Sequence, residues 1–517
     1  MAVADLASRD WDVVVVGGGH NGLTAAAYLA RAGRSVLVLE RREQVGGACT
    51  LERSFPDPGY LVSPCAYLVG LLHPLVIEEL NLARHGFRVH PADPHLWCPF
   101  QDGTSLALWN DTQRTREAVA ALAPADVEGY LAYERLFARI RTLLRTSERD
   151  TWLGDSPSRD EIETLLGHDA ELIEVVFEAS IAAVIERYVR DERLRTALHG
   201  QGVIGTYAGP RDAGTAAVHL MHTMGTLQGE GGVWGYVHGG MGRTSFALAD
   251  AAREAGALVA AGVPVAEILP GEGVRLEGGE RIRARAVVSN ADPKRTLALC
   301  AGEVDPSFRA RIDAWRIDSP VVKLNCGLSR FPRFLAAERD DPTPYRGMVT
   351  ISRGVDATQA AYQASRRGEP APEWCELYFH TAYDPSISPA GKQTMSVFAQ
   401  YAPYTLAEGD WDTRREEIGD RVLASIARFA PDVFEVVEQR EVLGPPDIEA
   451  RVGLTGGHIF QGECLPDQMW ERRLNPRTPI AGLYLCGAAT HPGGSVIGAN
   501  GRNAAMAVLA DLNRAST

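Results

Sequence analysis

The residue spacing with the clearest chemistry lies near the N-terminus, where an apolar strand runs into closely spaced glycines. Residues 12–16 lead into Gly17, Gly19 and Gly22 with the spacing Gly-x-Gly-x-x-Gly, and residues 23–32 continue as a predicted helix. The first glycine permits a tight turn, the second lets the main chain approach a pyrophosphate, and the third lets the helix pack on the strand. Free N–H groups at the helix start then face the phosphates. The expected phosphate-binding residues are Gly17, Gly19, His20, Asn21 and Gly22.

An acidic residue follows the next predicted strand. Residues 35–39 are mainly apolar and end at Glu40, close to the ~20-residue distance at which a carboxylate meets a ribose hydroxyl. A free 2′-hydroxyl is therefore expected. NADP is disfavoured because its 2′-phosphate would face a carboxylate, although Arg41 and Arg42 follow directly and weaken that exclusion. We expect both Glu40 and Arg41 to contact the cofactor.

A second glycine loop distinguishes FAD from NAD. Gly46, Gly47 and Ala48 bring the chain back to the phosphate end of the site only six residues after Glu40. NAD does not need this second loop, whereas extended FAD needs further main-chain donors with no side chain in the way. The loop therefore predicts FAD, with Gly46, Gly47 and Ala48 in contact with it. We expect noncovalent binding, since no cysteine or histidine lies in a recognisable flavin-attachment motif.

Composition and charge describe a large enzyme. The 517 residues, of which 45% are hydrophobic, suggest about three structural units at ~150 residues each. The net charge of −14 argues against nucleic acid and against electrostatic adhesion to anionic lipid. No apolar run approaches the ~18 residues of a membrane span, and the N-terminus lacks a signal-peptide pattern. We expect a cytoplasmic protein with at most peripheral membrane contact; the oligomeric state is left open.

The eight cysteines include no Cys-x-x-Cys pair and no metal-like cluster with histidine, so neither a redox dithiol nor a metal site is expected. A second nucleotide fingerprint after a strand is also missing, and the nearest pattern, residues 239–242, has the wrong spacing. These features separate the chain from disulfide reductases, which use FAD together with adjacent cysteines and NADPH.

The framework pattern returns in the middle of the chain. A glycine-rich segment, residues 231–242, leads into a predicted helix over residues 244–255, and Gly278-Gly279 then suggests a hairpin between strands. This succession resembles phytoene desaturases, in which a valine-rich strand passes the adenine with main-chain hydrogen bonds. The resemblance implies that Val265 contacts the adenine; the alternative is an apolar strand residue without ligand contact.

The C-terminal region carries a third match. A short strand near residue 483 runs into a glycine-rich loop, and a final helix is predicted to begin near Val496. Free N–H groups there can stabilise negative charge on a reduced flavin ring. The motif from Gly487 to Gly494 resembles phytoene dehydrogenase relatives, whereas amine oxidases usually carry an acidic residue where Ala488 stands. The resemblance implies flavin contacts from Gly487, Ser495 and Val496.

Together these segments resemble the phytoene dehydrogenase-like FAD-dependent oxidoreductases. Residues 455–463 and 466–469 resemble the branch that includes animal proteins named for a pyridine nucleotide-disulfide oxidoreductase domain, and carotenoid ketolases share the fold. The implied fold class is α/β: a Rossmann-like FAD-binding domain of the glutathione-reductase and amine-oxidase type, with an inserted mixed α+β substrate domain and a helical segment. The expected FAD-binding parts are residues 1–66, 231–300 and 451–517; residues 67–230 form an inserted substrate and helical region, and residues 301–450 a substrate domain.

The resemblance implies a dehydrogenase. Flavin N5 accepts a hydride from a C–H bond and the electrons pass onward, here to a diffusible acceptor such as oxygen or a quinone. The implied substrate is a lipophilic small molecule, possible classes being carotenoids and other polyenes. Ser63 stands where carotene desaturases commonly have an acidic residue, which is a departure from the carotenoid pattern.

Catalytic residues are less well marked. His491 lies in the loop before the last helix and is a candidate for a residue near the flavin, the alternative being a structural histidine. Trp234 and Tyr236 are candidates for an aromatic wall or for simple packing. Other chemistries remain open on this fold: a flavin-dependent amine oxidase, a carotenoid ketolase, an isomerase without net redox change, or a flavin-carrying interaction protein without turnover.

Overall fold

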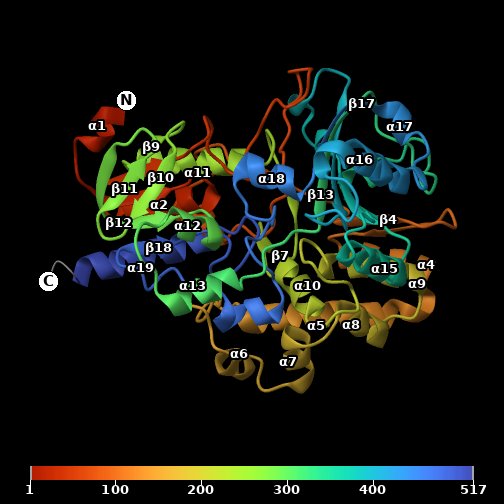
Figure 1. Ribbon diagram of the computed structural model, residues 1–517. Helices are drawn as coiled ribbons and strands as arrows, with labels where there is room; N and C mark the ends of the chain where they lie inside the picture. The colour runs from red at the N-terminus through yellow and green to blue at the C-terminus, as the bar shows by residue number, and fades with distance from the viewer. Residues whose placement is uncertain (1–2, 515–517) are drawn as a thin grey trace.

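The structure is a computed structural model that describes residues 3–514. Two seven-stranded sheets lie at opposite ends of the molecule, and a layer of helices runs beneath them (Figure 1). The first sheet has the strand order β10-β11-β12-β1-β2-β9, with β18 paired to β12. Its strands are β1 (Trp11–Val16), β2 (Val36–Leu39), β9 (Leu258–Ala260), β10 (Val265–Leu269), β11 (Gly273–Leu276), β12 (Arg281–Ser289) and β18 (Leu483–Leu485).

The centre of this sheet is parallel and buried on both faces. Strand β1 pairs in parallel with β12 on one side and with β2 on the other, and the valines at 13–15 have no exposed surface. A continuous run of β-branched residues is typical of such a central strand. The strands come from the N-terminal, middle and C-terminal parts of the chain, whose carboxyl ends therefore meet at one edge of the sheet.

Helices cover one face of the first sheet, and on the other face Val14 and Val16 pack with Ile268 and Val274 of β10 and β11. Helix α2 follows β1 and packs against α11 and α19. The approach to α19 is close at Gly501, where an added Cβ atom would lie 2.1 Å from the main-chain oxygen of Asn21. The helices around this sheet are α1 (Val3–Ala7), α2 (His20–Arg31), α3 (Pro74–Glu79), α11 (Arg243–Glu254), α12 (Pro293–Leu299), α13 (Pro306–Asp313) and α19 (Ala499–Arg514).

The second sheet is mainly antiparallel, with the order β17-β13-β16-β15-β14-β4-β5. Every residue of β13 is buried, and α16 packs against β17. The strands are β4 (Leu96–Pro99), β5 (Ser105–Leu108), β13 (Val321–Leu328), β14 (Met348–Ile351), β15 (Trp374–Tyr378), β16 (Gln393–Gln400) and β17 (Val437–Leu443). The accompanying helices are α14 (Thr343–Arg346), α15 (Val355–Arg366), α16 (Trp411–Ala427), α17 (Val433–Val436) and α18 (Pro445–Val452).

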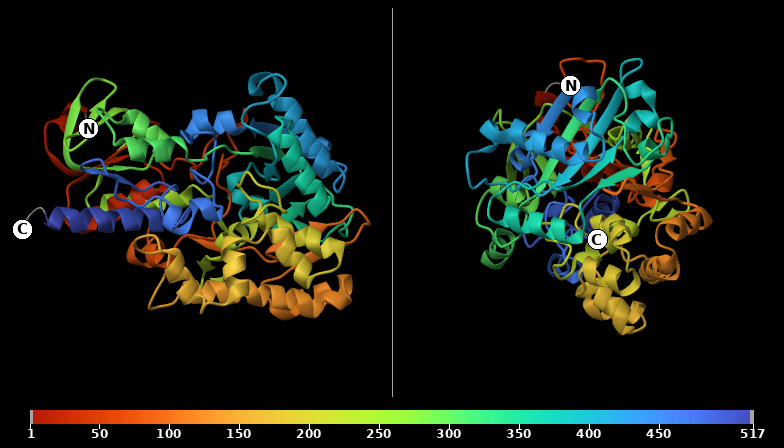
Figure 2. Two further views of the ribbon diagram at one scale, coloured as in Figure 1. Left: turned by 60° about the horizontal axis from the view of Figure 1, so that its bottom comes forward. Right: turned by 90° about the vertical axis from the view of Figure 1, so that its right-hand side faces the viewer.

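The inserted region 67–230 supplies the helical layer and also β4 and β5 of the second sheet. Figure 2 shows these helices, coloured orange and yellow, beneath both sheets. They are α4 (Thr112–Leu122), α5 (Val127–Leu144), α6 (Arg159–Leu165), α7 (Ala170–Phe177), α8 (Ile181–Tyr188), α9 (Glu192–Leu198) and α10 (Thr215–Thr223). Two short ribbons pair β3 (Val89–Pro91) with β8 (Gly235–Val237) and β6 (Thr226–Leu227) with β7 (Glu230–Gly231).

Most predicted elements near the cofactor sequence motifs are present, with some boundaries displaced: α2 begins at His20 rather than at residue 23. The hairpin at Gly278-Gly279 is confirmed, since β11 and β12 pair in antiparallel fashion around it. The final helix begins at Ala499 rather than near Val496. The reason is that Ser495 and Gly498 have φ values of +86° and +74°, which a right-handed helix does not allow. Within residues 3–514, no helix combines the length and the apolar character needed to cross a bilayer.

Candidate active site

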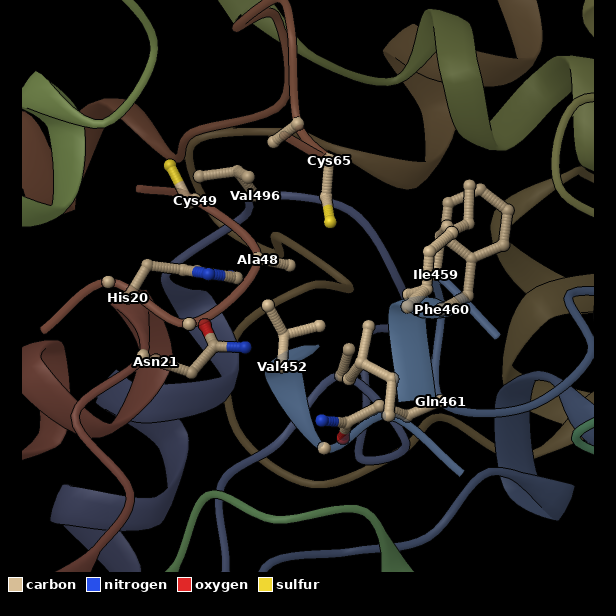
Figure 3. A pocket seen from close by; sticks show the side chains of 18 of the residues that line it. His20, Asn21, Ala48, Cys49, Cys65, Val452, Ile459, Phe460, Gln461 and Val496 are labelled. Carbon is tan, nitrogen blue, oxygen red and sulfur yellow. The ribbon is translucent and has the colours of Figure 1, made fainter. Parts of the chain in front are cut away.

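One cavity of about 420 Å³ extends from the carboxyl ends of β1 and β2 to one face of the second sheet. Figure 3 shows His20 and Asn21 on one side of this space and Phe460 and Gln461 on the other. We call the part beside β1, β2 and α2 the nucleotide end and the part beside β13, β16 and β15 the aromatic end. A crevice at the carboxyl ends of parallel strands is the usual position of a ligand in such sheets.

Two glycine loops lie side by side at the nucleotide end. Gly46 pairs with Gly19 as an isolated bridge and donates its N–H to the carbonyl oxygen of Gly18 at 2.8 Å. An added Cβ atom at Gly47 would lie 3.4 Å from the Cα atom of Gly19. Gly19 precedes α2 and has no side chain to cap it, so the first N–H groups of the helix remain available to an anion.

Two polar atoms at the start of α2 are buried without a partner. His20 Nε2 and Asn21 Oδ1 have no hydrogen-bond partner among the described residues, and both side chains line the cavity. Burial lowers the pKa of His20 to about 4, so its ring is neutral at pH 7. Buried polar atoms in proteins are nearly always hydrogen-bonded. These two therefore fit a polar ligand at the nucleotide end.

Glu40 is held in a fixed position at this end. Its side chain is 6% exposed; Oε2 accepts a hydrogen bond from the Gly18 N–H at 2.8 Å, and Oε1 accepts one from the Arg42 N–H at 2.9 Å. Glu40 lines the cavity together with Arg41 and Val265. An ionised carboxylate has room for about four hydrogen bonds, so it can still accept from a ribose hydroxyl.

Three of the predicted site residues do not line the cavity. Gly22 has a packing role, since an added Cβ atom would lie 2.3 Å from the carbonyl oxygen of Gly17; at Gly487 the same atom would lie 2.3 Å from Gln461 Oε1. His491 is 1% exposed, and its Nε2 lies 2.6 Å from the carbonyl oxygen of Thr151. This position gives no support to the catalytic role predicted for His491; it fits the structural alternative. The predicted residues that do line the cavity are Gly17, Gly19, His20, Asn21, Glu40, Arg41, Gly46, Gly47, Ala48, Val265, Ser495 and Val496.

The aromatic end is built on three adjacent strands. Lys323 on β13 lies directly opposite Phe398 on β16, and Phe398 lies directly opposite Glu376 on β15. Directly opposed residues point to the same face of a sheet, and all three line the cavity. The floor of the aromatic end therefore carries a basic group and an acidic group on either side of an aromatic ring.

Lys323 is 1% exposed and belongs to a polar cluster within this floor. Its Nζ donates to Asn325 Oδ1 at 2.9 Å and to Ser396 Oγ, and it lies 5.5 Å from the centre of the Tyr67 ring. Burial lowers the pKa of Lys323 to about 8. The ammonium form still predominates at pH 7, and two of its three N–H groups already have side-chain acceptors.

Glu376 is also 1% exposed. Its Oε1 accepts a hydrogen bond from Gln201 Nε2 at 2.9 Å, and its Oε2 accepts one from the Tyr378 hydroxyl. Burial raises the pKa of Glu376 to about 7 because a low-dielectric environment disfavours the charged form. Near neutral pH this carboxyl is present in both protonation states.

Aromatic rings form the walls around these two groups. Tyr67 stacks on Tyr378 with ring centres 4.2 Å apart and lies 5.7 Å from Phe398. Trp234 and Phe460 also line the cavity. Trp234 therefore belongs to an aromatic wall, whereas Tyr236 is buried away from the cavity lining and stacks on Tyr383. This end can surround an apolar molecule.

Comparison with known proteins assigns the chain. The family model of flavin-containing amine oxidoreductases matches residues 22–509. The chain belongs to this family. It is also 36% identical to the rat (Rattus norvegicus) pyridine nucleotide-disulfide oxidoreductase domain-containing protein 2, over 97% of this chain and 94% of the relative.

Proteins similar to this chain in sequence or in fold are named for several chemistries. The chain is 25% identical to the phytoene desaturase (lycopene-forming) of Pseudescherichia vulneris, over 96% of this chain and 99% of the relative. A structure of putrescine oxidase bound to putrescine shares the fold with a TM-score of 0.59 at 16% identity, covering 98% of this chain and 99% of that one. The predicted resemblance and the predicted fold class are confirmed. The chain is an FAD-dependent oxidoreductase of the amine oxidase and phytoene desaturase superfamily.

The residues at the nucleotide end fit the flavin nucleotide that this family binds. The unpartnered atoms of His20 and Asn21, the bare loops at Gly19 and Gly47, and the carboxylate of Glu40 are the groups that would hold its phosphates and ribose. A flavin nucleotide in this position would have its ring toward the aromatic end, since the cavity is continuous.

Several residues that line the cavity were not predicted from the sequence. Asn290 is the first residue after β12, just as Gly17 follows β1, so its position after a parallel strand was an available signal. Lys323 and Glu376 are each the one acidic or basic residue in a short, otherwise uncharged run, Val-Val-Lys-Leu and Trp-Cys-Glu-Leu-Tyr. A buried charge in such a strand is a usable signal. Nothing in the sequence marks Gln201 as the neighbour of Glu376.

Proposed function

We propose that the protein binds one noncovalent FAD at the nucleotide end and dehydrogenates a C–H bond of a mainly apolar small molecule held at the aromatic end. The observation that carries this proposal is the single cavity that joins the glycine loops around α2 to the aromatic floor of the second sheet. A cofactor site and a substrate site with this arrangement share one water-shielded space. Ligand pockets of enzymes are commonly mostly apolar with a few placed polar groups.

The chemistry that FAD supplies when bound is hydride acceptance at N5 followed by onward electron transfer. Residues of the protein bind and orient the ligands, exclude water and hold protons. Tyr67, Phe398 and Phe460 orient an apolar molecule and exclude water, and the free N–H groups at the start of α2 neutralise phosphate charge. Lys323 and Glu376 hold protons on the floor of the aromatic end.

Two further points support an apolar substrate and a diffusible electron acceptor. One relative is named for phytoene desaturation, and aromatic rings line one end of the cavity in this chain. All eight cysteines are free, and the sequence has one nucleotide fingerprint. We therefore propose that electrons leave for oxygen or a quinone rather than for a thiol pair or a nicotinamide.

Two successive experiments test the proposal, the first on flavin content and the second on flavin reduction. The purified protein is reconstituted with FAD, freed of excess, and its visible spectrum recorded before and after denaturation and filtration. We expect one FAD per chain, all of it released. The loaded protein is then mixed without oxygen with polyenes, cyclic terpenoids and primary amines. Bleaching by an apolar C–H donor supports dehydrogenation, bleaching by amines alone makes the protein an amine oxidase, and failure to take up FAD overturns the proposal.

A further inference from the structure

Glu376 is the starting point, because a buried carboxyl is an unusual floor for an apolar site. Glu40, Glu277 and Glu376 are the acidic residues among the described cavity-lining side chains, and the first two lie at the nucleotide end with Val265. Glu376 is therefore the one carboxyl among the described residues that line the aromatic end. It lies on β15, paired to β14 and β16 on either side, so its main chain is fixed.

The protein fills only part of the hydrogen-bonding capacity of the Glu376 carboxylate. Gln201 donates to one oxygen and Tyr378 to the other, and an ionised carboxylate has about four acceptor positions. Since Gln201, Tyr378 and Glu376 all line the cavity, the unused positions belong to a group that faces the ligand space. These two partners fix the carboxyl at the wall of the cavity, where little of its own surface is exposed.

A pure hydrocarbon is a poor match to this floor. It would exclude water from Glu376 and offer no hydrogen bond in return, which leaves a buried acceptor incompletely paired. A site built to hydrogen-bond a substrate group discriminates strongly against an analogue that lacks the group. The ligand that fits carries a hydrogen-bond donor on an apolar body.

The charges facing the site favour a neutral donor over an ammonium. Lys323 lies on the same face as Glu376, with Phe398 between them, at a distance of roughly 10 Å for two strand spacings. Its cation balances the Glu376 carboxylate, so an added cation would meet repulsion as well as attraction. His222, from α10, adds no charge, since burial lowers its pKa to about 4. With Glu376 ionised these charges cancel, and with Glu376 protonated the charge of Lys323 remains, so in both states the aromatic end suits a hydroxyl better than an ammonium.

We propose that the aromatic end binds an apolar molecule through a hydroxyl group that donates a hydrogen bond to Glu376. This inference rests on the proposed function, since it names the substrate class for the same cavity. It concerns recognition and holds whether or not a given alcohol is turned over. Glu376 is thus a specificity-determining residue.

Matched ligands test the inference on the unaltered FAD-loaded protein. The sets are decane, decanol, its methyl ether and decylamine, and cymene, cuminyl alcohol, its methyl ether and cuminylamine. Affinity is measured without oxygen from the perturbation of the visible flavin spectrum and from the shift in thermal stability. We expect at least one alcohol to bind about ten- to a hundredfold more tightly than its hydrocarbon and its ether, because only the alcohol can donate. The ether separates donation from size and polarity.

Two variants place the effect at Glu376. Glu376→Gln can keep both existing bonds, with its oxygen accepting from Gln201 and its amide donating to the Tyr378 hydroxyl; we expect the preference for alcohol to fall about tenfold. Glu303→Gln, at an exposed loop position, is the control and should keep the preference. The inference is overturned if no alcohol binds, if hydrocarbon or ether binds as tightly as alcohol, if the amine binds best, or if a folded Glu376→Gln keeps the full preference. Failure of flavin reduction with tight alcohol binding would count against the proposed function alone.

Discussion

Lys323 and Glu376 flank Phe398 on three hydrogen-bonded strands, so an ammonium and a carboxyl share the floor of the aromatic end of the cavity. Each is 1% exposed, and burial moves the pKa of each toward neutrality, downward for Lys323 and upward for Glu376. A buried pair separated by a ring is not a salt bridge that serves stability. It is an arrangement of proton-holding groups that face a ligand, as expected where pKa values are strongly perturbed in a cleft.

Replacement of Glu376 should change how stability depends on pH. The folded-state pKa of about 7 lies above the ordinary 4.5, so between these values the folded protein binds more protons than the unfolded chain. Its contribution to stability is full below about pH 4.5 and is lost as pH rises through 7. Glu376→Gln removes this loss and should be more stable than the parent at pH 8, by up to roughly 3 kcal/mol.

The measurement is the free energy of unfolding in urea for parent and variant at pH 5 and pH 8. The difference between the two proteins should grow with pH. A difference that stays constant across this range would show that Glu376 ionises normally in the folded protein.

Loss of the Glu40 carboxylate should weaken FAD binding. Hydrogen bonds to a charged group contribute ~1.5–3 kcal/mol, so Glu40→Ala should reduce affinity by roughly one to two decades. The carboxylate also accepts hydrogen bonds from the Gly18 and Arg42 N–H groups, so part of the loss comes from weaker loop support; Glu40→Gln, whose amide nitrogen cannot accept, would leave one of these N–H groups unpaired. Titration of the apoprotein with FAD gives the affinities, with Glu43→Ala at an exposed neighbouring position as control. Equal affinity for Glu40→Ala and the parent would refute the ribose role.

Nicotinamide nucleotides should not reduce the bound flavin. The chain has one glycine fingerprint, and in the described structure β9 to β12 complete the same sheet as that fingerprint rather than a second nucleotide domain. The check is anaerobic stopped-flow mixing of the FAD-loaded protein with saturating NADH or NADPH. Rapid bleaching by either would reveal an overlooked nicotinamide site and would make the protein a reductase.

Replacement of His491 should affect stability more than turnover. Its Nε2 is bonded to the Thr151 carbonyl oxygen, and through this bond the loop before α19 is tied to the inserted helical region. His491→Ala should lower the thermal midpoint, because a net hydrogen bond contributes about 1 kcal/mol and a cavity is left. The rate of flavin reduction per bound flavin should stay close to that of the parent. A large fall in that rate with normal flavin content would restore a catalytic role.

The parts of the site that the sequence determined are short and local. Strand β1, the turn at Gly17 and the start of α2 are contiguous in the chain, and their geometry follows from glycine conformations and from helix N–H groups. Glu40 belongs with them because β2 pairs in register with β1 and ends at the same edge. Local stereochemistry and the rules of parallel sheets are sufficient to predict this half of the site.

The aromatic end of the cavity was decided only by the tertiary structure. Gln201 from the helical insertion bonds to Glu376 on β15, and Tyr67, at the start of the inserted region, stacks on Tyr378. These contacts join residues far apart in sequence, and no turn or helix rule specifies them. The order of strands in the second sheet sets which side chains share a face, and it depends on long-range pairing, which carries no local signal. The sequence therefore determined how a flavin nucleotide is held, whereas the packing of the second sheet against the helical layer decided what lies beside it.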